Sequence, residues 1–282
     1  MESGICIHSL SGHDSYVHTL CHHPTEPILA CGVGKSVYLW NLETRQQTRT
    51  LEGHQGQVWK VVFSPDRQRL ASTCFDQTVK VWDWQTGHCL STLQGHSSWV
   101  FGADFSPDGQ WLATSSIDRT IKLWAVSTGE CLRTVAIAED YMPDVAFSPD
   151  GHHLVGGGSQ GLLMIWTMDT EAPPRVIQAH AGFIGAVRFS PDGKTLASSS
   201  HDQTIKLWNM ATFDCLQTLT GHENMISAVA FSVDGQTVAS ACLDVSVRVC
   251  DVGSGEGLLE LRSPRPYEGM NIEGTTGLAD TQ

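Results

Sequence analysis

Residues 95–126 read GHSSWVFGADFSPDGQWLATSSIDRTIKLWAV, which is three runs of β-forming residues separated by turn signals. The Ser-Pro-Asp-Gly tetrapeptide at 106–109 is a turn for physical reasons, because proline fixes φ, aspartate bonds nearby backbone and glycine accepts a positive φ. A second turn at 127–129 precedes a fourth run at 131–135. The stretch predicts four short antiparallel strands in one sheet, which is too small to be stable alone.

The same unit returns along the chain. A tryptophan ends the third run at positions 40, 82, 124, 166 and 208, a constant step of 42 residues, and the sixth step meets Cys250. A fixed period of this length indicates one supersecondary unit in several copies, and four-stranded sheets repeated radially form a propeller. We expect an all-β propeller of six four-stranded blades, with units near residues 12–52, 53–94, 95–136, 137–178, 179–220 and 221–262, preceded by a strand at 4–10.

The predicted fourth strands do not match the number of blades. Ile5–Leu10 at the front and Leu258–Arg262 at the end bring their number to seven, one more than six blades need. The alternative is an incomplete seven-bladed ring, which lacks three strands and takes the missing propeller segment from another chain. Residues 263–282 are not repeat-like, and we expect a C-terminal tail that is partly disordered.

Composition restricts the partners and the compartment. The net charge of −13 disfavours nucleic acid and anionic membranes as partners. No apolar stretch approaches the roughly 20 residues of a membrane helix, and the first residues lack the basic segment and apolar core of a signal peptide. Nine cysteines without a Cys-x-x-Cys pair indicate a reducing compartment, so we expect a cytoplasmic protein. We also expect the cysteines at recurring positions to be small buried apolar residues, namely Cys74, Cys89, Cys131, Cys215 and Cys242.

Three motifs recur in the same order in the units. They are a Gly-His opening, the Ser-Pro-Asp turn and a Leu-Trp or Val-Trp-Asp ending, as in Gly53-His54, Ser64-Pro65-Asp66 and Val81-Trp82-Asp83. In these motifs residues 4–262 resemble the WD-repeat β-propeller family. Residues 264–272 resemble the C-terminal end of bacterial WD-repeat proteins, including those with a signalling ATPase domain upstream. The second resemblance implies a bacterial sensor or scaffold module.

The resemblance to the WD-repeat family implies a buried tetrad of His, Ser or Thr, Asp and Trp in each regular blade. The residue types suit such a network, because the indole donates, the hydroxyl relays and the imidazole donates to the carboxylate. The first unit offers Ala30 and Gly34 at the Ser and Asp positions, and the sixth has Cys250 for Trp. The fourth unit has Ala138 for His and keeps only Trp166, so we expect the fourth blade to be the least rigid. The complete sets are His54, Ser72, Asp76, Trp82; His96, Thr114, Asp118, Trp124; and His180, Ser198, Asp202, Trp208.

Motifs that suggest chemistry have simpler interpretations. Ser, His and Asp recur together in several units, with the Ser in a strand, which argues against a catalytic triad. Residues 157–161 match G-x-S-x-G but precede a strand rather than a helix, and residues 32–36 lack the first glycine and the helix of a phosphate loop. We find no convergent ionisable groups without a repeat equivalent, so we expect no enzyme activity and no cofactor. Four possible metal ligands lie close together in the sequence, namely His18, Cys21, His22 and His23. They would not converge on one metal ion, because successive side chains on a strand point to opposite sides.

Two loop positions recur that in the WD family lie on the narrow face near the central channel. One lies three residues after the opening histidine, and the other directly precedes the turn aspartate. Their residues are mostly large and apolar, where plain turns are polar, and Trp59 and Phe101 extend the set, so we expect a recognition surface. The alternative is that these side chains cover each other or cap the channel. The predicted binding residues are Tyr16, Phe75, Trp99, Ile117, Tyr141, Phe183, His201, Met225 and Leu243.

The function expected from this surface is that of a non-enzymatic scaffold that binds protein or peptide. Aromatic anchors in an acidic surround suit a partner that carries apolar and basic residues. Two alternatives remain open: a sensor or regulatory module of a larger bacterial signalling polypeptide, and a ligand or enzyme site in the central channel.

Overall fold

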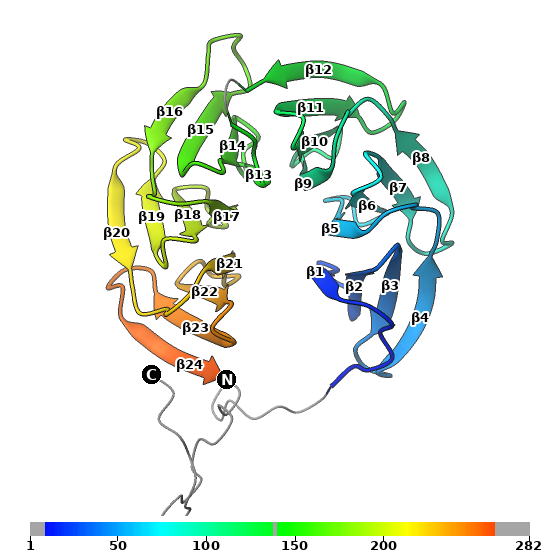
Figure 1. The fold of residues 1–282 in the computed structure, drawn as a ribbon, viewed down its shortest axis with the longest axis horizontal. Helices are drawn as coiled ribbons and strands as arrows, with labels where there is room; N and C mark the ends of the chain where they lie inside the picture. Colours follow the sequence, from blue (N-terminus) through cyan, green and yellow to red (C-terminus); the bar gives the residue numbers. More distant parts are fainter. Residues whose placement is uncertain (1–8, 138–139, 263–282) are drawn as a thin grey trace, which may run out of the picture.

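The computed structural model describes residues 9–137 and 140–262, and these form six four-stranded antiparallel sheets around a ring (Figure 1). Within each sheet the strands follow one another from the channel outward (Figure 1). We call the sheets blades 1 to 6 in chain order. Their strands are β1 (Val17–His22), β2 (Ile28–Val33), β3 (Ser36–Asn41) and β4 (Gln46–Leu51); β5 (Val58–Phe63), β6 (Arg69–Cys74), β7 (Val79–Asp83) and β8 (Cys89–Leu93); β9 (Val100–Phe105), β10 (Trp111–Ser116), β11 (Thr120–Ala125) and β12 (Cys131–Ala136); β13 (Asp144–Phe147), β14 (His153–Gly157), β15 (Leu162–Thr167) and β16 (Arg175–Gln178); β17 (Ile184–Phe189), β18 (Thr195–Ser200), β19 (Ile205–Asn209) and β20 (Cys215–Leu219); β21 (Ile226–Phe231), β22 (Thr237–Cys242), β23 (Ser246–Asp251) and β24 (Gly257–Arg262).

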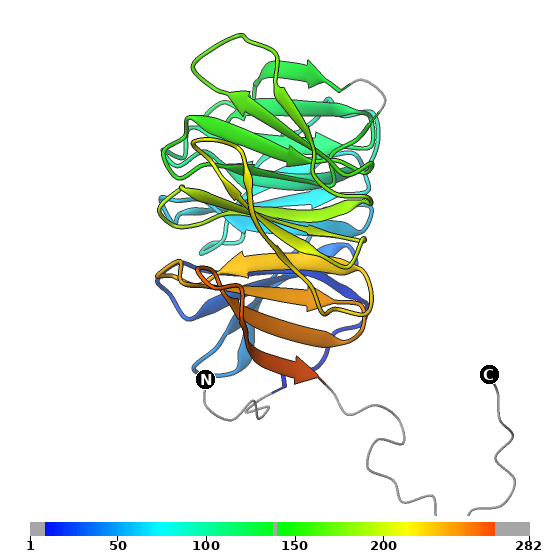
Figure 2. The ribbon, with the colours of Figure 1, turned by 90° about the vertical axis from the view of Figure 1, so that its left-hand side faces the viewer.

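The expected all-β class and the six four-stranded blades are confirmed. No helix in the described part of the chain is long and apolar enough to cross a membrane. Seen from the side, the turns that join the strands lie on the two faces of the ring (Figure 2). The C-terminal tail and residues 4–8 of the predicted first strand lie outside the described residues.

The Ser-Pro-Asp turns close the first hairpin of a blade through side chains. The Ser106 hydroxyl donates to the Asp108 carboxylate at 2.5 Å and accepts the Trp111 amide at 2.9 Å. Gly109 supplies the positive φ of 68° that ends the turn. Because the serine links the two strand ends, the hairpin register is set by the turn itself.

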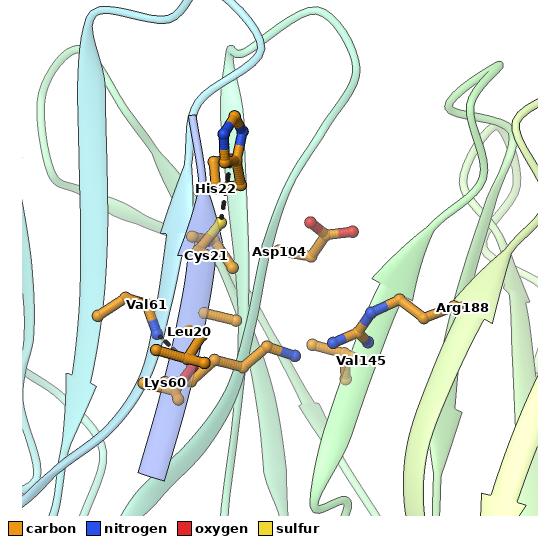
Figure 3. Close-up of a pocket in the computed structure, with 11 residues that line it drawn as sticks. Leu20, Cys21, His22, Lys60, Val61, Asp104, Val145 and Arg188 are labelled. Atoms are coloured by element: carbon orange, nitrogen blue, oxygen red, sulfur yellow. Dashed lines mark hydrogen bonds between the residues drawn. The ribbon is translucent and has the colours of Figure 1, made fainter. Parts of the chain in front are cut away.

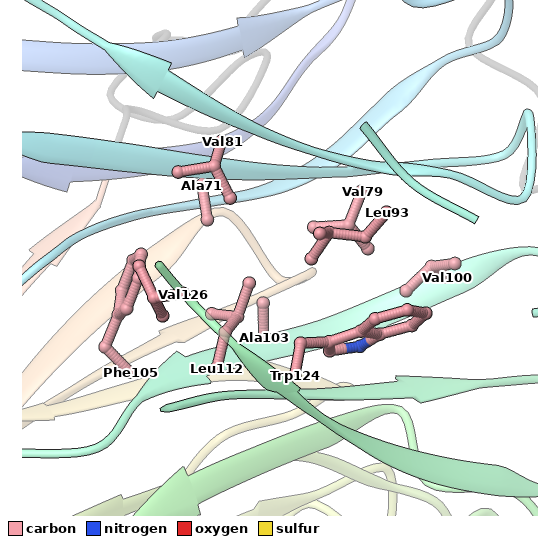
Figure 4. Packing of buried hydrophobic residues seen from close by; sticks show 10 residues of the cluster. All are labelled: Ala71, Val79, Val81, Leu93, Val100, Ala103, Phe105, Leu112, Trp124 and Val126. Atoms are coloured by element: carbon pink, nitrogen blue, oxygen red, sulfur yellow. The ribbon is translucent and has the colours of Figure 1, made fainter. Parts of the chain in front are cut away.

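The core consists of apolar layers between consecutive blades. Between blades 2 and 3, Ala71 and Val81 from one sheet pack against Ala103, Leu112 and Trp124 from the next (Figure 4). Four further clusters of this kind join blades 1 and 2, 3 and 4, 4 and 5, and 5 and 6. Each blade therefore shields a face of its neighbour, which a single small sheet cannot do.

As far as residues 9–137 and 140–262 show, the ring is open between blade 6 and blade 1. The inner strands β1, β5, β9, β13, β17 and β21 contact one another in that order, but among the described strands β21 makes no comparable contact with β1. Figure 1 shows the interruption between the blade of β21–β24 and the blade of β1–β4.

The first blade corrects one alignment made from the 42-residue step. Cys31 pairs with Leu20 and Tyr38 as Ser72 pairs with Val61 and Lys80, so Cys31, not Ala30, occupies the serine position. The turn after β2 is also shorter, since Val33 pairs directly with Ser36, and no residue stands at the aspartate position given to Gly34. The step of 42 at the tryptophans hides this shift, whereas the Gly-His openings at 12–13 and 53–54, which are 41 residues apart, reveal it.

The cysteine expectation was wrong for one repeat position. Cys89, Cys131 and Cys215 are exposed, whereas Cys74 and Cys242 are buried as expected. The exposed cysteines begin the outer strands, which have no blade beyond them to cover their outward side chains.

Candidate functional site

In blade 3 four side chains form a connected buried network. The His96 Nδ1–H donates to the Asp118 carboxylate at 2.8 Å, and Nε2 accepts the Thr114 hydroxyl at 2.8 Å. The Trp124 indole N–H donates to the same hydroxyl at 2.8 Å. Each buried polar atom in the chain of bonds thereby has a partner.

Blades 2 and 5 repeat this geometry closely. The imidazole-to-carboxylate distances are 2.9 Å for His54 and Asp76 and 3.0 Å for His180 and Asp202. Ser72 and Ser198 accept the Trp82 and Trp208 indoles at 2.8 and 2.9 Å. In blade 6, His222 reaches Asp244 at 3.2 Å and Ser240 at 2.8 Å, with Cys250 in place of the indole donor.

The protonation states of these groups suit a structural role. Burial acts to raise the pKa of Asp118, but the Thr120 hydroxyl and the Ser97 amide outweigh it and hold the pKa below its usual value. Burial lowers the pKa of His96, so its imidazole is neutral at pH 7. An imidazole between a carboxylate and a hydroxyl recurs in several blades, and nothing about it singles out one blade for catalysis.

Blade 4 replaces the network in two ways. Met142 packs against Trp166 over Gly156, which stands at the serine position, and among the described residues the Trp166 indole N–H has no hydrogen-bond partner. Nearby, the buried Asp140 carboxylate accepts the Ser159 and Tyr141 amides at 3.0 and 2.7 Å and also binds the Ser159 hydroxyl. Sequence reasoning missed Asp140, because the residues at the equivalent position of the other units are not acidic. Ala138 lies outside the described residues.

The two predicted loop positions meet in pairs. In blades 3, 4 and 5 the backbone amides of Ile117, Ser159 and His201 donate to the carbonyls of Trp99, Tyr141 and Phe183 at 3.0, 3.0 and 2.8 Å. Leu243 bonds to Met225 in the same way at 3.0 Å, and Phe75 bonds to Gln57 at 3.0 Å. One rim of the described ring therefore carries both sets of side chains, blade after blade.

Rings on this rim contact one another both within a blade and between neighbouring blades. Phe75 lies flat on Trp99, with centroids 4.4 Å apart and planes 9° apart, and Phe183 stacks on His201 at 4.3 Å. Trp59 touches His18 at 4.9 Å. We call the whole group the aromatic belt. The ring centroid of each member lies within 6.4 Å of that of at least one other member, and the members are Tyr16, His18, Trp59, Phe75, Trp99, Phe101, Tyr141, Phe183 and His201.

The belt is partly covered by its own members and partly open. Tyr16 and Trp99 are 81% and 46% exposed, and Met225 and Leu243 on the same rim are 41% and 60% exposed. Phe75, Phe101 and Tyr141 are half-buried. Stacking thus fixes the rings in place, while the anchors at the open positions keep large apolar surface toward solvent.

The central channel holds charged groups that sequence reasoning missed. Lys60 and Arg188 point toward one another from β5 and β17 across a cavity of about 280 Å³ that Asp104 also lines (Figure 3). The Lys60 ammonium pairs with Asp144, and the Arg188 guanidinium donates to Asp144 at 2.5 Å. The expectation that no ionisable groups converge there was therefore wrong. The available signal was four charges in first strands whose equivalents are mostly apolar or glycine.

These charges bind the blades together. The Asp104 carboxylate accepts the Phe147 amide of the next blade at 2.8 Å, and Asp144 accepts the Val187 amide of the blade after that at 3.2 Å. Burial raises the pKa of Asp104 to about 6. Burial also acts on Asp144, but the charges of Arg188 and Lys60 outweigh it and lower the pKa. The two carboxylates therefore differ in charge at mildly acidic pH.

The histidines considered as metal ligands in the sequence analysis have separate contacts of their own. His18 stacks on Trp59, and the Nδ1 of the buried His23 accepts the Glu26 amide at 2.9 Å in the turn that follows it. Two other groups have ligand-type atoms within 4.8 Å of one another, His54, Cys74, Asp76 and His222, Cys242, Asp244. In both groups the imidazole and carboxylate already bond to each other.

Comparison with known proteins agrees with this architecture. Residues 16–215 match the family model described as the IFT122 first beta-propeller, and residues 213–251 match the WD domain, G-beta repeat. Coronin-7 of Mus musculus is 34% identical over 73 residues, 25% of this chain and 8% of that protein. DDB1- and CUL4-associated factor 13 of Dictyostelium discoideum is 34% identical over 76 residues, 26% and 17% of the two chains. Superkiller complex protein 8 of the same organism is 31% identical over 75 residues, 26% and 25%.

The aligned part therefore spans a quarter or less of each of these relatives. The family model, in contrast, covers most of the described ring, from β1 into β20. With its six four-stranded blades and repeated motifs, the chain belongs to the WD-repeat β-propeller family.

Proposed function

We propose that the protein is a non-enzymatic scaffold that binds a protein or peptide through the aromatic belt. The observation that carries the proposal is the unbroken series of rings from Tyr16 to His201, with Trp99 and Tyr16 open to solvent. Rings already held by stacking lose little freedom on binding, and buried aromatic anchors dominate the energy of many interfaces. Relatives described as a complex protein and an associated factor support a protein partner in general terms.

The partner's chemistry follows from charge. The chain carries 30 acidic and 17 basic residues, so its net charge is negative. A partner segment with apolar side chains flanked by lysine or arginine would therefore place the apolar side chains on the belt, while its basic side chains are attracted by the negative charge of the chain.

A displayed library of random peptides tests the proposal with a defined probe. We expect the wild-type chain to enrich peptides with aromatic or aliphatic residues beside basic ones. The double variant Trp99→Ala, Phe183→Ala should lose about 10–30-fold in affinity for them. Trp111→Ala is the matched control, since this tryptophan is 36% exposed but begins β10 at the opposite end of the blade, and it should bind normally. Equal binding by the double variant and the control would exclude the belt as the binding surface.

A second candidate is a regulatory module within a larger signalling polypeptide, which the open ring favours. An antibody against residues 95–126 distinguishes the two in native extracts. A band at the mass of 282 residues supports the independent scaffold, and only a larger band supports the regulatory module.

We also propose a cytoplasmic location. All eight described cysteines are free, which suits a reducing compartment. Fractionation of the source cells tests this location, and recovery of the protein in a membrane or secreted fraction would contradict it.

A further inference from the structure

The guanidinium group that lines the central cavity uses only part of its hydrogen-bonding capacity. Arg188 donates through Nη1 alone, to the Asp144 carboxylate at 2.5 Å and to the Val187 carbonyl at 2.6 Å. Within residues 9–137 and 140–262, its Nε and Nη2 have no hydrogen-bond partner. The side chain is 37% exposed and lines the cavity (Figure 3). The edge formed by Nε and Nη2 is therefore available to a ligand.

The Asp104 carboxyl lines the same cavity and also has an unused atom. Its Oδ2 accepts the Phe147 amide at 2.8 Å, whereas Oδ1 has no hydrogen-bond partner in the part of the chain that the structure describes. Burial raises the pKa of Asp104 to about 6, although the Phe147 amide and the charges of Lys60 and Arg188 act to lower it. At mildly acidic pH this carboxyl therefore carries a proton, which it can donate to an anion.

The charges around Asp104 favour an anion once that proton is bound. Lys60 of β5 and Arg188 of β17 both pair with the Asp144 carboxylate of β13. Burial and the charge of Arg188 lower the pKa of Lys60, while Asp144 opposes them. With Asp104 protonated, two basic groups share one carboxylate, although the chain as a whole has a net charge of −13.

Charges at these positions are not needed for one blade to pack on the next. The equivalents of Asp144 in blades 5 and 6 are Ala186 and Ala228, and the equivalent of Asp104 in blade 4 is Ala146. These alanines occupy the same registers in blades that also pack closely. The charged set is therefore particular to one part of the channel, unlike the repeated tetrads.

The rest of the cavity offers apolar walls. It has a volume of about 280 Å³, and its lining includes Val62, Ala103 and Val145. On β1 the wall carries His22 and Cys21, and burial raises the pKa of the Cys21 thiol, so this thiol is neutral. Apolar walls with a few polar groups at one end are typical of sites for small organic ligands.

We propose that the cavity binds a small organic monocarboxylate. The Nε and Nη2 of Arg188 donate to its two carboxylate oxygens, and the Asp104 carboxyl donates to one of them. A short aliphatic body packs against Val62, Ala103 and Val145. This site is separate from the aromatic belt and does not depend on the proposed scaffold function.

The probe is butyrate, titrated into the full chain by isothermal titration calorimetry at pH 5.5 in a chloride-free buffer. We expect one butyrate per chain. Butyramide has the same shape without the charge, and inorganic phosphate has charge without the apolar body, so each should bind at least about tenfold more weakly. The proposal is overturned if butyrate shows no saturable binding up to about 10 mM, or if phosphate or butyramide binds as tightly.

The pH dependence tests the part played by Asp104. Affinity for butyrate should fall about 10–30-fold from pH 5.5 to pH 7.5, because binding at the higher pH requires Asp104 to take up a proton from the buffer. Titrations in buffers of different ionisation enthalpy should show an uptake that approaches one proton per butyrate at pH 7.5. Asp104→Asn donates through its amide at any pH and should bind equally at both values.

His22→Gln is the matched control for this experiment, because it removes another titratable side chain of the cavity wall. It should keep the pH dependence of the wild type. A pH dependence that persists in Asp104→Asn, or that disappears in His22→Gln, would overturn the assignment of the proton to Asp104.

Substitutions at the guanidinium locate the ligand. Arg188→Lys keeps a positive charge beside Asp144 but loses the paired donors, so it should bind butyrate at least about tenfold more weakly. Lys194→Gln removes a cation whose side chain is 84% exposed, and it should bind as the wild type does. Melting temperatures of both variants separate loss of binding from loss of folding. Folded Arg188→Lys with wild-type affinity would refute the site.

The belt variant Trp99→Ala, Phe183→Ala separates this proposal from the scaffold function. It should bind butyrate with the affinity of the wild type, because neither residue lines the cavity. Loss of butyrate binding in this variant would contradict a site built on Arg188 and Asp104.

Discussion

At the residue scale, the buried polar groups decide which side chains cannot be changed without loss. The tetrad of blade 3 is connected at every step, so removal of one member leaves others unpaired. Asp118→Ala strands the His96 Nδ1–H and the Ser97 amide, which donate to that carboxylate at 2.8 and 2.9 Å. We expect a loss of about 1–3 kcal/mol in the free energy of unfolding, measured by denaturant titration. Asp169→Ala, at a carboxylate whose side chain is 67% exposed, should stay within about 0.5 kcal/mol of wild type, and equal effects would disprove the buried network.

Asp104 should make the folded chain less stable as the pH rises. Burial raises its pKa to about 6 in the folded chain, above the ordinary value of 3.8, so the folded state holds the proton more tightly. Stability then falls as the pH rises from about 4 to about 7, by up to about 3 kcal/mol from this group. Asp104→Asn keeps an acceptor for the Phe147 amide and should remove this fall. The difference in the free energy of unfolding between the wild type and the variant should therefore grow in magnitude as the pH rises. A difference that is constant with pH would contradict the assignment.

At the element scale, blades with and without a tetrad should differ in local stability. The Trp166 indole of blade 4 has no partner among the described residues, and β13 and β16 have only four residues each. We predict faster amide hydrogen exchange in β14 and β15 than in β10 and β11. As a control, Ser198→Ala strands the Trp208 indole of blade 5 and should speed exchange in β18 and β19 about 5–30-fold. Blade 4 exchanging as slowly as blade 3 would show that apolar packing by Met142 replaces the network fully.

Prediction from sequence succeeded for the repeated features and failed for those particular to one unit. The strands and their pairing could be predicted from periodicity and turn residues, because each blade repeats the same pattern of β-forming residues and the same turns. The Cys31 register was missed because the turn after β2 is one residue shorter, so residues before it lie 41 rather than 42 residues from their equivalents in blade 2, while the tryptophan spacing stays at 42. The Lys60, Asp144 and Arg188 cluster was missed because its members lie on three different blades and meet only across the channel. The aromatic positions were found as a repeat, but their mutual stacking depends on ring geometry between blades.

At the scale of the whole molecule, one substitution at equivalent positions separates open from closed interfaces. Leu20 and Val61 hold the same register in β1 and β5, yet their exposures are 61% and 2%. Leu20→Asp should leave the melting temperature nearly unchanged. Val61→Asp buries an unpaired charge and should cost more than about 3 kcal/mol, measured by thermal and denaturant unfolding. Comparable losses for both would mean that blade 1 is covered in solution.

Hydroxyl-radical footprinting of the isolated chain, read residue by residue by mass spectrometry, tests the open ring of stacked blades most directly. Leu20 and Val247 should be oxidised at rates close to that of the exposed Leu132, while Val61 and Ile205, at the same registers inside closed interfaces, should be protected. Protection of Leu20 and Val247 to the level of Val61 and Ile205 would contradict the open ring, and oxidation of all four at similar rates would contradict the stacking of blades.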